Sequence, residues 1–173
     1  MDIKIVEIKH IHEITLDYSE SVKENYKLCN NELLLFEYAC EIPNLEGSAR
    51  EQRKSNLSEI LQNDGVILND ICCNRIVGIA SLKNKLYRKG RMQLYSLHID
   101  REFRGKGIGK SLFEGIEAIA KEKCAKGLYI SASPKKNTID FYLKQGAIIT
   151  KDIEEELYRE EPEDIHLEKM WRI

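Results

Sequence analysis

A glycine-rich segment between an alternating stretch and an amphipathic one constrains the fold of this chain more than any other feature. Residues 104–111 read RGKGIGKS, with glycine at 105, 107 and 109. Residues 92–99 alternate as in a strand, and residues 107–124 repeat apolar side chains every three or four positions, as in a helix. Glycines let the backbone approach a ligand closely, and the first amides of a helix lack intrahelical partners. We therefore predict an anion-binding turn where a strand passes into a helix.

Several phosphate-binding loops share this physics, so the residue spacing has to distinguish among them. A nucleoside triphosphatase loop that ends at Gly109-Lys110-Ser111 would need glycine where Arg104 stands. A dinucleotide-binding fingerprint would need its third glycine at position 110 or 112, where the chain has lysine and leucine. The pattern that fits is Arg/Gln-x-x-Gly-x-Gly/Ala, which Arg104, Gly107 and Gly109 supply.

Hydrophobic periodicity predicts the remaining elements and an α/β fold class. We expect an opening strand at 3–8 and then a helical region from 11 to 62, in which 31–40 and 48–61 are the clearest helices. A β-hairpin follows, with the adjacent Cys72 and Cys73 near its turn. We expect the strands of the hairpin at 66–68 and 76–80. After the strand at 92–99 and the helix that follows it, we expect strands at 128–130, 147–149 and 165–171, and a helix at 137–144.

Strict alternation in the strand at 92–99 divides its side chains between two faces. One face receives Leu94, Ser96 and His98, and the other receives Gln93, Tyr95, Leu97 and Ile99. Because both faces are partly apolar, we expect a central strand. The acidic run at 154–156 is interpreted as a solvated loop or helix face.

Size and charge limit the classes of function. The 173 residues, of which 42% are hydrophobic, fit one globular domain spanning 1–173. A net charge of −2 without any long basic run disfavours nucleic-acid binding. No stretch approaches the roughly 18 apolar residues that a membrane span needs, so we expect a cytoplasmic protein without membrane association.

The cysteine and histidine spacings predict no metal site. The five cysteines include no Cys-x-x-Cys pair, so we expect reduced, mostly structural thiols. His10 and His12 have no nearby cysteine or second histidine cluster, and we interpret them as surface residues.

Together with the strand that precedes it, the glycine motif closely resembles that of the GNAT superfamily of N-acetyltransferases. A second block agrees in order and spacing, since Asn137, Phe141-Tyr142 and Gly146 resemble the family's asparagine, Phe-Tyr and glycine pattern. Ala147 stands where the family usually has Phe, a departure that concerns core packing. The blocks span about 93–147. The resemblance implies a GNAT-like mixed, splayed β-sheet flanked by α-helices, in which the central strand diverges from the next one.

The resemblance also implies acetyl-CoA as the cosubstrate, without a metal, and a set of residues that hold it. The glycine motif would bind the pyrophosphate through backbone amides, and residues 97–99 would pair with the pantetheine arm. The implied cofactor-binding residues are Leu97, His98, Ile99, Arg104, Gly105, Lys106, Gly107, Ile108, Gly109, Lys110, Asn137 and Tyr142.

Acyl transfer to an amine needs a proton acceptor for the amine and a proton donor for the departing thiolate. By its family position, Tyr142 is the candidate donor; the alternative is that it only packs in its helix. His98 is a candidate base because its intrinsic pKa is near 6.5, although its side chain could equally point into the core. The family often places a glutamate on the central strand, but residues 92–99 contain no carboxylate. The base stays unassigned, with Glu37 and Glu41 as further candidates.

These features predict acetyl-CoA-dependent N-acetylation of a small-molecule or peptide amine by direct attack in a ternary complex. Alternatives within enzymes are a different acyl-CoA donor or a hydroxyl acceptor. A non-catalytic CoA-binding regulatory domain is the alternative from another class, and a loop at 104–110 that binds RNA phosphates is the least favoured. The sequence does not identify the acceptor amine. The oligomeric state stays open, with a homodimer among the alternatives.

Overall fold

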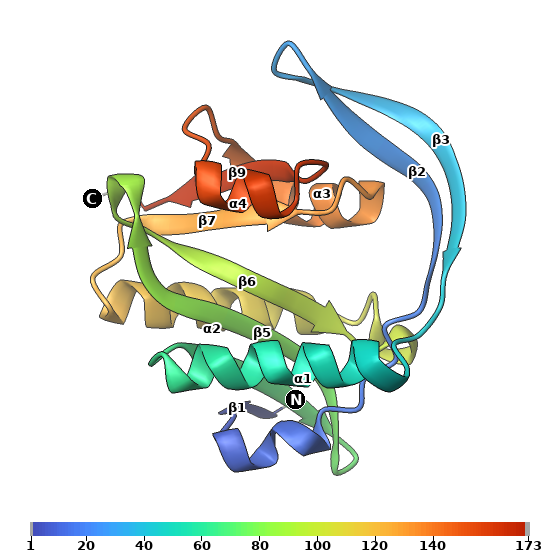
Figure 1. Cartoon of the computed structure of the whole chain (residues 1–173), viewed down its shortest axis with the longest axis vertical. Coiled ribbons are helices and arrows are strands. Elements are labelled where there is room, and N and C mark those ends of the chain that lie inside the picture. Colours follow the sequence, from blue (N-terminus) through green and yellow to red (C-terminus); the bar gives the residue numbers. More distant parts are fainter. Residues whose placement is uncertain (1, 172–173) are drawn as a thin grey trace.

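The computed structural model describes residues 2–171, which form a seven-stranded sheet with helices on both faces and a separate two-stranded ribbon (Figure 1). The strands of the sheet lie in the order β1-β4-β5-β6-β7-β9-β8. Every strand that the sequence predicted for this sheet is present, with some ends displaced. The bounds are β1 (Asp2–Ile5), β4 (Val66–Cys72), β5 (Arg75–Tyr87), β6 (Arg91–Ile99), β7 (Gly127–Ala132), β8 (Ile148–Ile149) and β9 (Ile165–Met170).

The sheet divides between β6 and β7. Among the described strands, these two are the one parallel pair, and residues 91–94 of β6 pair with residues 127–130 of β7. Beyond Leu94, β6 continues to Ile99 without a neighbour on that side, and Figure 1 shows the two strands diverging. The predicted mixed, splayed sheet is confirmed. Along the divergent part of β6, main-chain N–H and C=O groups on one edge have no strand to pair with.

A β-bulge in β6 lies at the same point. Ser81 of β5 pairs with Ser96, but the next residue, Leu82, pairs with Leu94. Two steps along β6 therefore match one step along β5, and Tyr95 is the extra residue. The bulge begins where pairing with β7 ends, so it helps to bend β6 away from its neighbour.

The bulge changes which side chains share a face. Leu94 and Leu97 both pack in the apolar cluster beneath α2 (Ile108–Glu122). Tyr95 packs with the cluster on the opposite face, where the ring of His98 also lies. The strict alternation expected from the sequence, with Leu94 and His98 on one face, is therefore wrong. A single extra residue reverses the alternation, and no residue type in the strand marks it.

Helices cover each face of the sheet over a separate apolar cluster. In Figure 1, α2 lies behind the sheet and α1 lies in front of it. α2 buries an apolar stripe, and each such side chain contributes roughly 1.5–3 kcal/mol when fully buried. None of the described helices is long and apolar enough to cross a membrane. The predicted helices at 48–61, 107–124 and 137–144 are confirmed as α1 (Gly47–Gln62), α2 and α3 (Lys136–Lys144), and a short helix, α4 (Glu155–Glu160), follows.

The predicted helix at 31–40 is wrong. The chain there forms a β-ribbon of β2 (Glu20–Cys29) and β3 (Glu32–Ile42), preceded by a 3-10 turn at Ile8–Glu13. Asn30 and Asn31 join the two strands with φ of 51° and 65°. Two left-handed residues make the turn that suits a tight hairpin, and asparagine accepts this conformation readily. The Asn-Asn pair is the feature of the sequence that indicates this turn, whereas the apolar run after it suggests a helix face.

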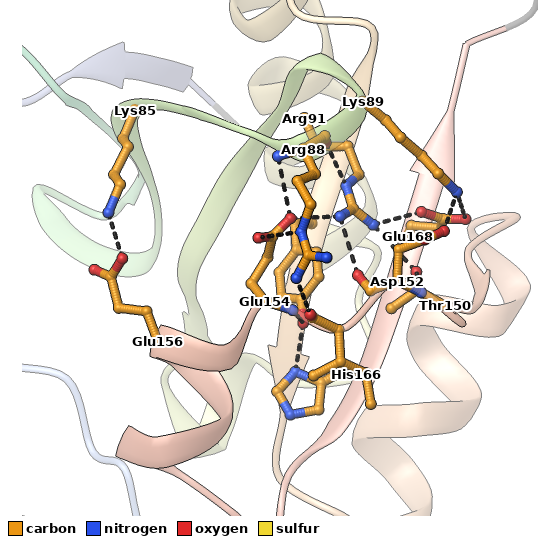
Figure 2. Close-up of polar contacts among 12 residues, drawn as sticks. Lys85, Arg88, Lys89, Arg91, Thr150, Asp152, Glu154, Glu156, His166 and Glu168 are labelled. Atoms are coloured by element: carbon orange, nitrogen blue, oxygen red, sulfur yellow. Dashed lines mark hydrogen bonds and ion pairs between the residues drawn. The ribbon is translucent and has the colours of Figure 1, made fainter.

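Arg91, at the start of β6, is fully buried and holds together segments that are far apart in the sequence (Figure 2). Its guanidinium donates to Glu168 Oε2 at 2.5 Å and to Glu154 Oε1 at 2.6 Å. It also donates to the hydroxyl of Thr150 and to the carbonyl of Asp152. These bonds tie the segment between β8 and α4 to β6 and β9. Because breaking a buried ion pair is strongly destabilising, the Arg91 network fixes where α4 begins.

The acidic run at 154–156 is therefore not wholly solvated, contrary to the expectation from the sequence. Glu154 is only 8% exposed, whereas Glu155 and Glu156 are exposed. The partner that holds Glu154 is Arg91, which lies 63 residues earlier in the chain. No local pattern reveals a pairing over that separation.

Candidate active site

The divergence of β6 from β7 opens a cleft of about 1180 Å³. Side chains of β6 line it on both faces of the sheet, and residues of the loop before α2 and of α3 line it from one face. Residues of α1 and of the α4 segment line it from the other face.

The ribbon closes one end of the cleft, because β2 reaches across the divided sheet. The Tyr26 N–H donates to the carbonyl of Pro134 at 2.7 Å, and its hydroxyl donates to Asp140 Oδ1 at 2.9 Å. Lys135 Nζ forms an ion pair with Glu20 Oε2 at 2.7 Å. These contacts attach β2 to α3 and to the loop before it.

The glycine loop has the form of an anion cradle. Gly105 and Gly107 have φ of +74° and +86°, and a Cβ built on either would meet no atom within 4 Å. The first hydrogen bond of α2 runs from the Ser111 N–H to the Gly107 carbonyl at 3.2 Å. The preceding helical amides have no intrahelical acceptor, and the helix dipole adds positive potential there. The loop thus has the open backbone and unpaired amides that an anion-binding turn needs.

Gly109 serves a different purpose in the same loop. Its φ is not positive, and a Cβ at this position would lie 3.4 Å from Phe141 Cε2 and 3.6 Å from Leu97 Cδ2. The small residue lets α2 approach α3 and β6 closely. The third glycine of the motif therefore concerns packing as well as the ligand.

The basic side chains of the loop are engaged within the protein or exposed. Arg104 donates from Nε to the Ile99 carbonyl at 3.1 Å and from Nη1 to the Ser19 carbonyl at 2.9 Å. Lys110 Nζ lies 3.8 Å from Glu114 on the surface of α2. Arg104 and Lys110 both line the cleft. The Arg104 guanidinium, however, holds the end of β6 to the segment before β2.

Two other predicted cofactor-binding residues do not line the cleft with their side chains. Ile108 is buried in the cluster beneath α2. Lys106 Nζ lies over the ring of Phe103, 4.6 Å from its centroid. Ile108 can serve the cradle only through its backbone amide, whereas the Lys106 side chain is exposed.

His98 faces the side of the cleft bordered by α1, where its ring meets that of Tyr18 edge to face, with centroids 5.1 Å apart. Burial and the charges of Arg53, Lys135 and Arg104 lower the pKa of His98 to about 3. The imidazole is therefore neutral at any ordinary pH, and its affinity for a proton is low. Leu97 and Ile99 also line the cleft, on the α2 side.

Asn137 and Tyr142 reach the cleft from α3, as the second sequence block predicted. Tyr142 is 7% exposed, and its ring packs against those of Phe113 and Phe141 at 6.0 and 5.2 Å. Within the described part of the chain, its hydroxyl has no hydrogen-bond partner. Burial raises the pKa of Tyr142 above its ordinary value, so the phenol keeps its proton at neutral and moderately alkaline pH.

The sequence did not predict the wall of the cleft that α1 and the α4 segment form. Asn56 of α1 donates to the Tyr95 hydroxyl at 3.1 Å, and Arg53 lies one helical turn away. Across the cleft, the Ser131 hydroxyl donates to Asp164 Oδ2 at 2.9 Å. These residues carry no motif, and only the fold brings them together. Glu37 and Glu41, weighed earlier as bases, lie on β3 and are not among the residues that line the cleft.

The described residues contain no group of three or more His, Cys, Asp or Glu side chains placed to hold a metal ion. His10 and His12 are not buried, and His10 Nδ1 bonds Glu13 at 2.8 Å. The five cysteines are free thiols, and Cys72 and Cys73 lie at the β4–β5 turn, as expected.

The fold is shared with solved acetyltransferases. A candidate streptothricin acetyltransferase from Bacillus anthracis, solved with acetyl coenzyme A, is 18% identical over 99% of this chain and 98% of its own, with a TM-score of 0.76. Nourseothricin acetyltransferase is 13% identical over 98% and 97% of the two chains, with a TM-score of 0.73. The PaiA N-acetyltransferase from Thermoplasma acidophilum, solved with coenzyme A, is 16% identical over 99% and 100%, with a TM-score of 0.62.

Comparison with curated protein sequences finds no match. The profile of the acetyltransferase (GNAT) family matches residues 31–147, which include the glycine loop, β6 and the block around Asn137. This match covers more than half of the chain, and the divided sheet has the mixed, splayed architecture that the resemblance implied. The chain therefore belongs to the GNAT family of acetyltransferases and is an acyltransferase by family.

Proposed function

We propose that this protein binds acetyl-CoA in the cleft between β6 and β7 and transfers its acetyl group to a primary amine in a ternary complex. The observation that carries the proposal is the cradle at 105–110, where two glycines with positive φ leave open space above unpaired amides. Residues of the cradle line a cleft whose walls come from both faces of the sheet. An enzyme that joins two substrates by direct attack needs access of this kind.

The chain's own groups suit the separate tasks of this reaction. Backbone amides of 105–110 bind the diphosphate, and the unpaired edge of β6 at 95–99 binds the extended arm by main-chain pairing. When bound, acetyl-CoA supplies the activated acetyl group. Tyr142 holds its phenolic proton at the cleft and donates it to the departing sulfur. His98, neutral because of its lowered pKa, shapes the wall beside the acetyl group.

The acceptor that we propose is a cationic small-molecule or peptide amine. Glu160, Glu161 and Asp164 line the cleft on the α4 side and would attract positive charge. Similar folds include proteins described as acetyltransferases of streptothricin, nourseothricin and aminoglycosides, whose names indicate small-molecule substrates. A homodimer and a cytoplasmic location stay predictions, to be measured by light scattering and by fractionation.

Calorimetry with acetyl-CoA and CoA, followed by a thiol-release assay, tests the proposal. The amine panel would contain streptothricin, kanamycin, spermidine and a lysine peptide, with octanoyl-CoA as a second donor. We expect binding of both nucleotides and turnover of acetyl-CoA with at least one amine. No binding at millimolar ligand would overturn the proposal. Binding without turnover over the whole panel would support a regulatory CoA-binding domain instead.

A further inference from the structure

Four carboxylates line the cleft, and they differ in what surrounds them. Glu20 is paired with Lys135. Glu160 and Glu161, at the end of α4, are exposed to solvent. Asp164 is partly buried and forms no ion pair with any side chain in the described part of the chain. Its charge, unlike the other three, is neither paired nor well hydrated.

Asp164 is held beside the point where the sheet divides. Ser131, which donates to its Oδ2, directly follows Ile130, the last residue of β7 that pairs with β6. Ile130 and Ala132 both pack in the cluster beneath α2. Because side chains alternate along a strand, the Ser131 side chain points to the opposite face, the one covered by α4. Asp164 therefore borders the cleft from the α4 face.

Tyr142 borders the cleft from the other face, on α3 behind the sheet. We propose, resting on the proposed function, that Asp164 is the general base that accepts the proton of the attacking amine, and that Ser131 is its positioning residue. The base then lies on the side from which the acceptor enters. The proton donor lies on the side of the cofactor sulfur.

Atoms and protons balance in this scheme. The ammonium group of the acceptor first loses one proton to solvent. The nitrogen of the resulting neutral amine forms a bond to the acetyl carbonyl carbon while the bond from that carbon to sulfur breaks. As the nitrogen gains positive charge it becomes acidic, and one of its protons passes to Oδ1 of Asp164. The sulfur receives the phenolic proton of Tyr142. The products are the N-acetyl amine and the CoA thiol, and water returns the proton of Asp164 to the Tyr142 phenolate.

The groups around Asp164 make its carboxylate a stronger proton acceptor. Burial and the neighbouring charge of Glu161 raise the pKa of Asp164, while the Ser131 hydrogen bond opposes the rise. Tyr142 of α3 lies near enough that the charge of Asp164 adds to burial in raising the pKa of its phenol, which therefore stays neutral. A raised pKa makes the carboxylate a better proton acceptor than an ordinary aspartate.

The first test compares Asp164→Asn with Glu163→Gln. Glu163 is adjacent and exposed and does not line the cleft, so the control removes the same charge. With the best amine of the panel, we expect Asp164→Asn to lower kcat by about 100-fold or more and the control to leave it unchanged. The Kd for acetyl-CoA should stay within about two-fold of wild type in both, since the cradle is intact. A kcat of Asp164→Asn within about three-fold of wild type would overturn the proposal.

The second test is the pH profile of kcat for Ser131→Ala. Losing the hydrogen bond removes an effect that lowers the pKa of Asp164, so the acidic limb should move to higher pH. An acidic limb of the kcat profile at the same pH as in the wild type would overturn the proposal. If Asp164→Asn no longer binds acetyl-CoA, Ser131→Ala is the variant that tests the role of Asp164. A wild-type protein without acetyl-CoA binding or turnover would instead count against the proposed function. The two failures are therefore distinguishable.

Discussion

Gly107 and Gly146 have nearly the same backbone conformation, with φ of +86° and +85°, but only Gly107 borders the cleft. Alanine in this region strains the backbone by about 1–2 kcal/mol. We expect Gly107→Ala and Gly146→Ala to lower the free energy of unfolding by similar amounts. Only Gly107→Ala should weaken acetyl-CoA binding, by about 10-fold or more, because its methyl group would occupy the cradle.

Calorimetry and urea unfolding of the two variants measure these effects. Space is open around both positions, since a Cβ at Gly146 would meet only Lys169 Cε, at 3.8 Å. Gly146→Ala therefore reproduces the backbone strain without touching the ligand. Equal losses of acetyl-CoA affinity in the two variants would show that general destabilisation, and not the cradle, controls binding.

Tyr142→Phe removes one hydroxyl and keeps the ring that packs against Phe113 and Phe141. If the hydroxyl donates a proton to sulfur, kcat should fall by about 10- to 100-fold with little change in acetyl-CoA affinity. Because burial raises the pKa of Tyr142, wild-type kcat should show no alkaline fall below about pH 10. Steady-state kinetics between pH 6 and about pH 10 measure both, with Tyr38→Phe, on the exposed ribbon, as the control.

Helix α4 has only six residues, and its position depends on contacts made just before it begins. Arg91 connects this segment to two strands of the sheet, and Figure 2 shows its guanidinium between the carboxylates of Glu154 and Glu168. The α4 segment in turn supplies one wall of the cleft. The buried network thus links the end of the sheet farthest from the cradle to the acceptor side of the site.

Arg91→Met should lower the free energy of unfolding by about 3–5 kcal/mol, because two buried carboxylates lose their shared partner. Urea unfolding measures the change. Arg88→Met is the control: Arg88 also bonds Glu154 but is 58% exposed, and surface pairs contribute about 1 kcal/mol or less. A loss for Arg91→Met no larger than for Arg88→Met would contradict this account of the network.

The stability of the folded chain should depend on pH through His98 and His166, whose side chains lose hydration on folding. Burial lowers the pKa of both His98 and His166 relative to their unfolded value near 6.5. A histidine of this kind favours the fold only while it is neutral, so its contribution is complete above about pH 6.5 and is lost as the pH falls toward the folded pKa. We expect Tm to decrease steadily from pH 7 to pH 5.

Thermal unfolding at several pH values measures this dependence. His98→Gln and His166→Gln should each reduce the slope of Tm against pH. His10→Gln should leave the slope unchanged, because His10 is partly exposed and its ring bonds Glu13 on the surface. A slope that survives removal of both buried histidines would assign the effect to carboxylates instead.

Local patterns were sufficient for the cradle, for α2 and for the block on α3. Each is a short, contiguous segment in which glycines or the spacing of apolar residues determine the conformation of neighbouring residues. The local structure of these segments can therefore be predicted from the sequence. The sequence pattern predicts a helix at 31–40, where β3 of the ribbon lies, although β3 is a contiguous segment too. Its side chains are mostly exposed, so no burial pattern marks the strand, and the Asn30-Asn31 turn is what decides it.

Tertiary structure alone decided the side-chain faces of β6 and the second wall of the cleft. One bulged residue, Tyr95, reverses the alternation, and it depends on how β5 pairs and not on the composition of β6. Asp164 meets Ser131 across 33 residues, and Arg91 meets Glu154 across 63. A sequence specifies local conformation through neighbouring residues, whereas proton transfer and buried charge depend on groups that only the folded sheet brings within a few ångströms of each other.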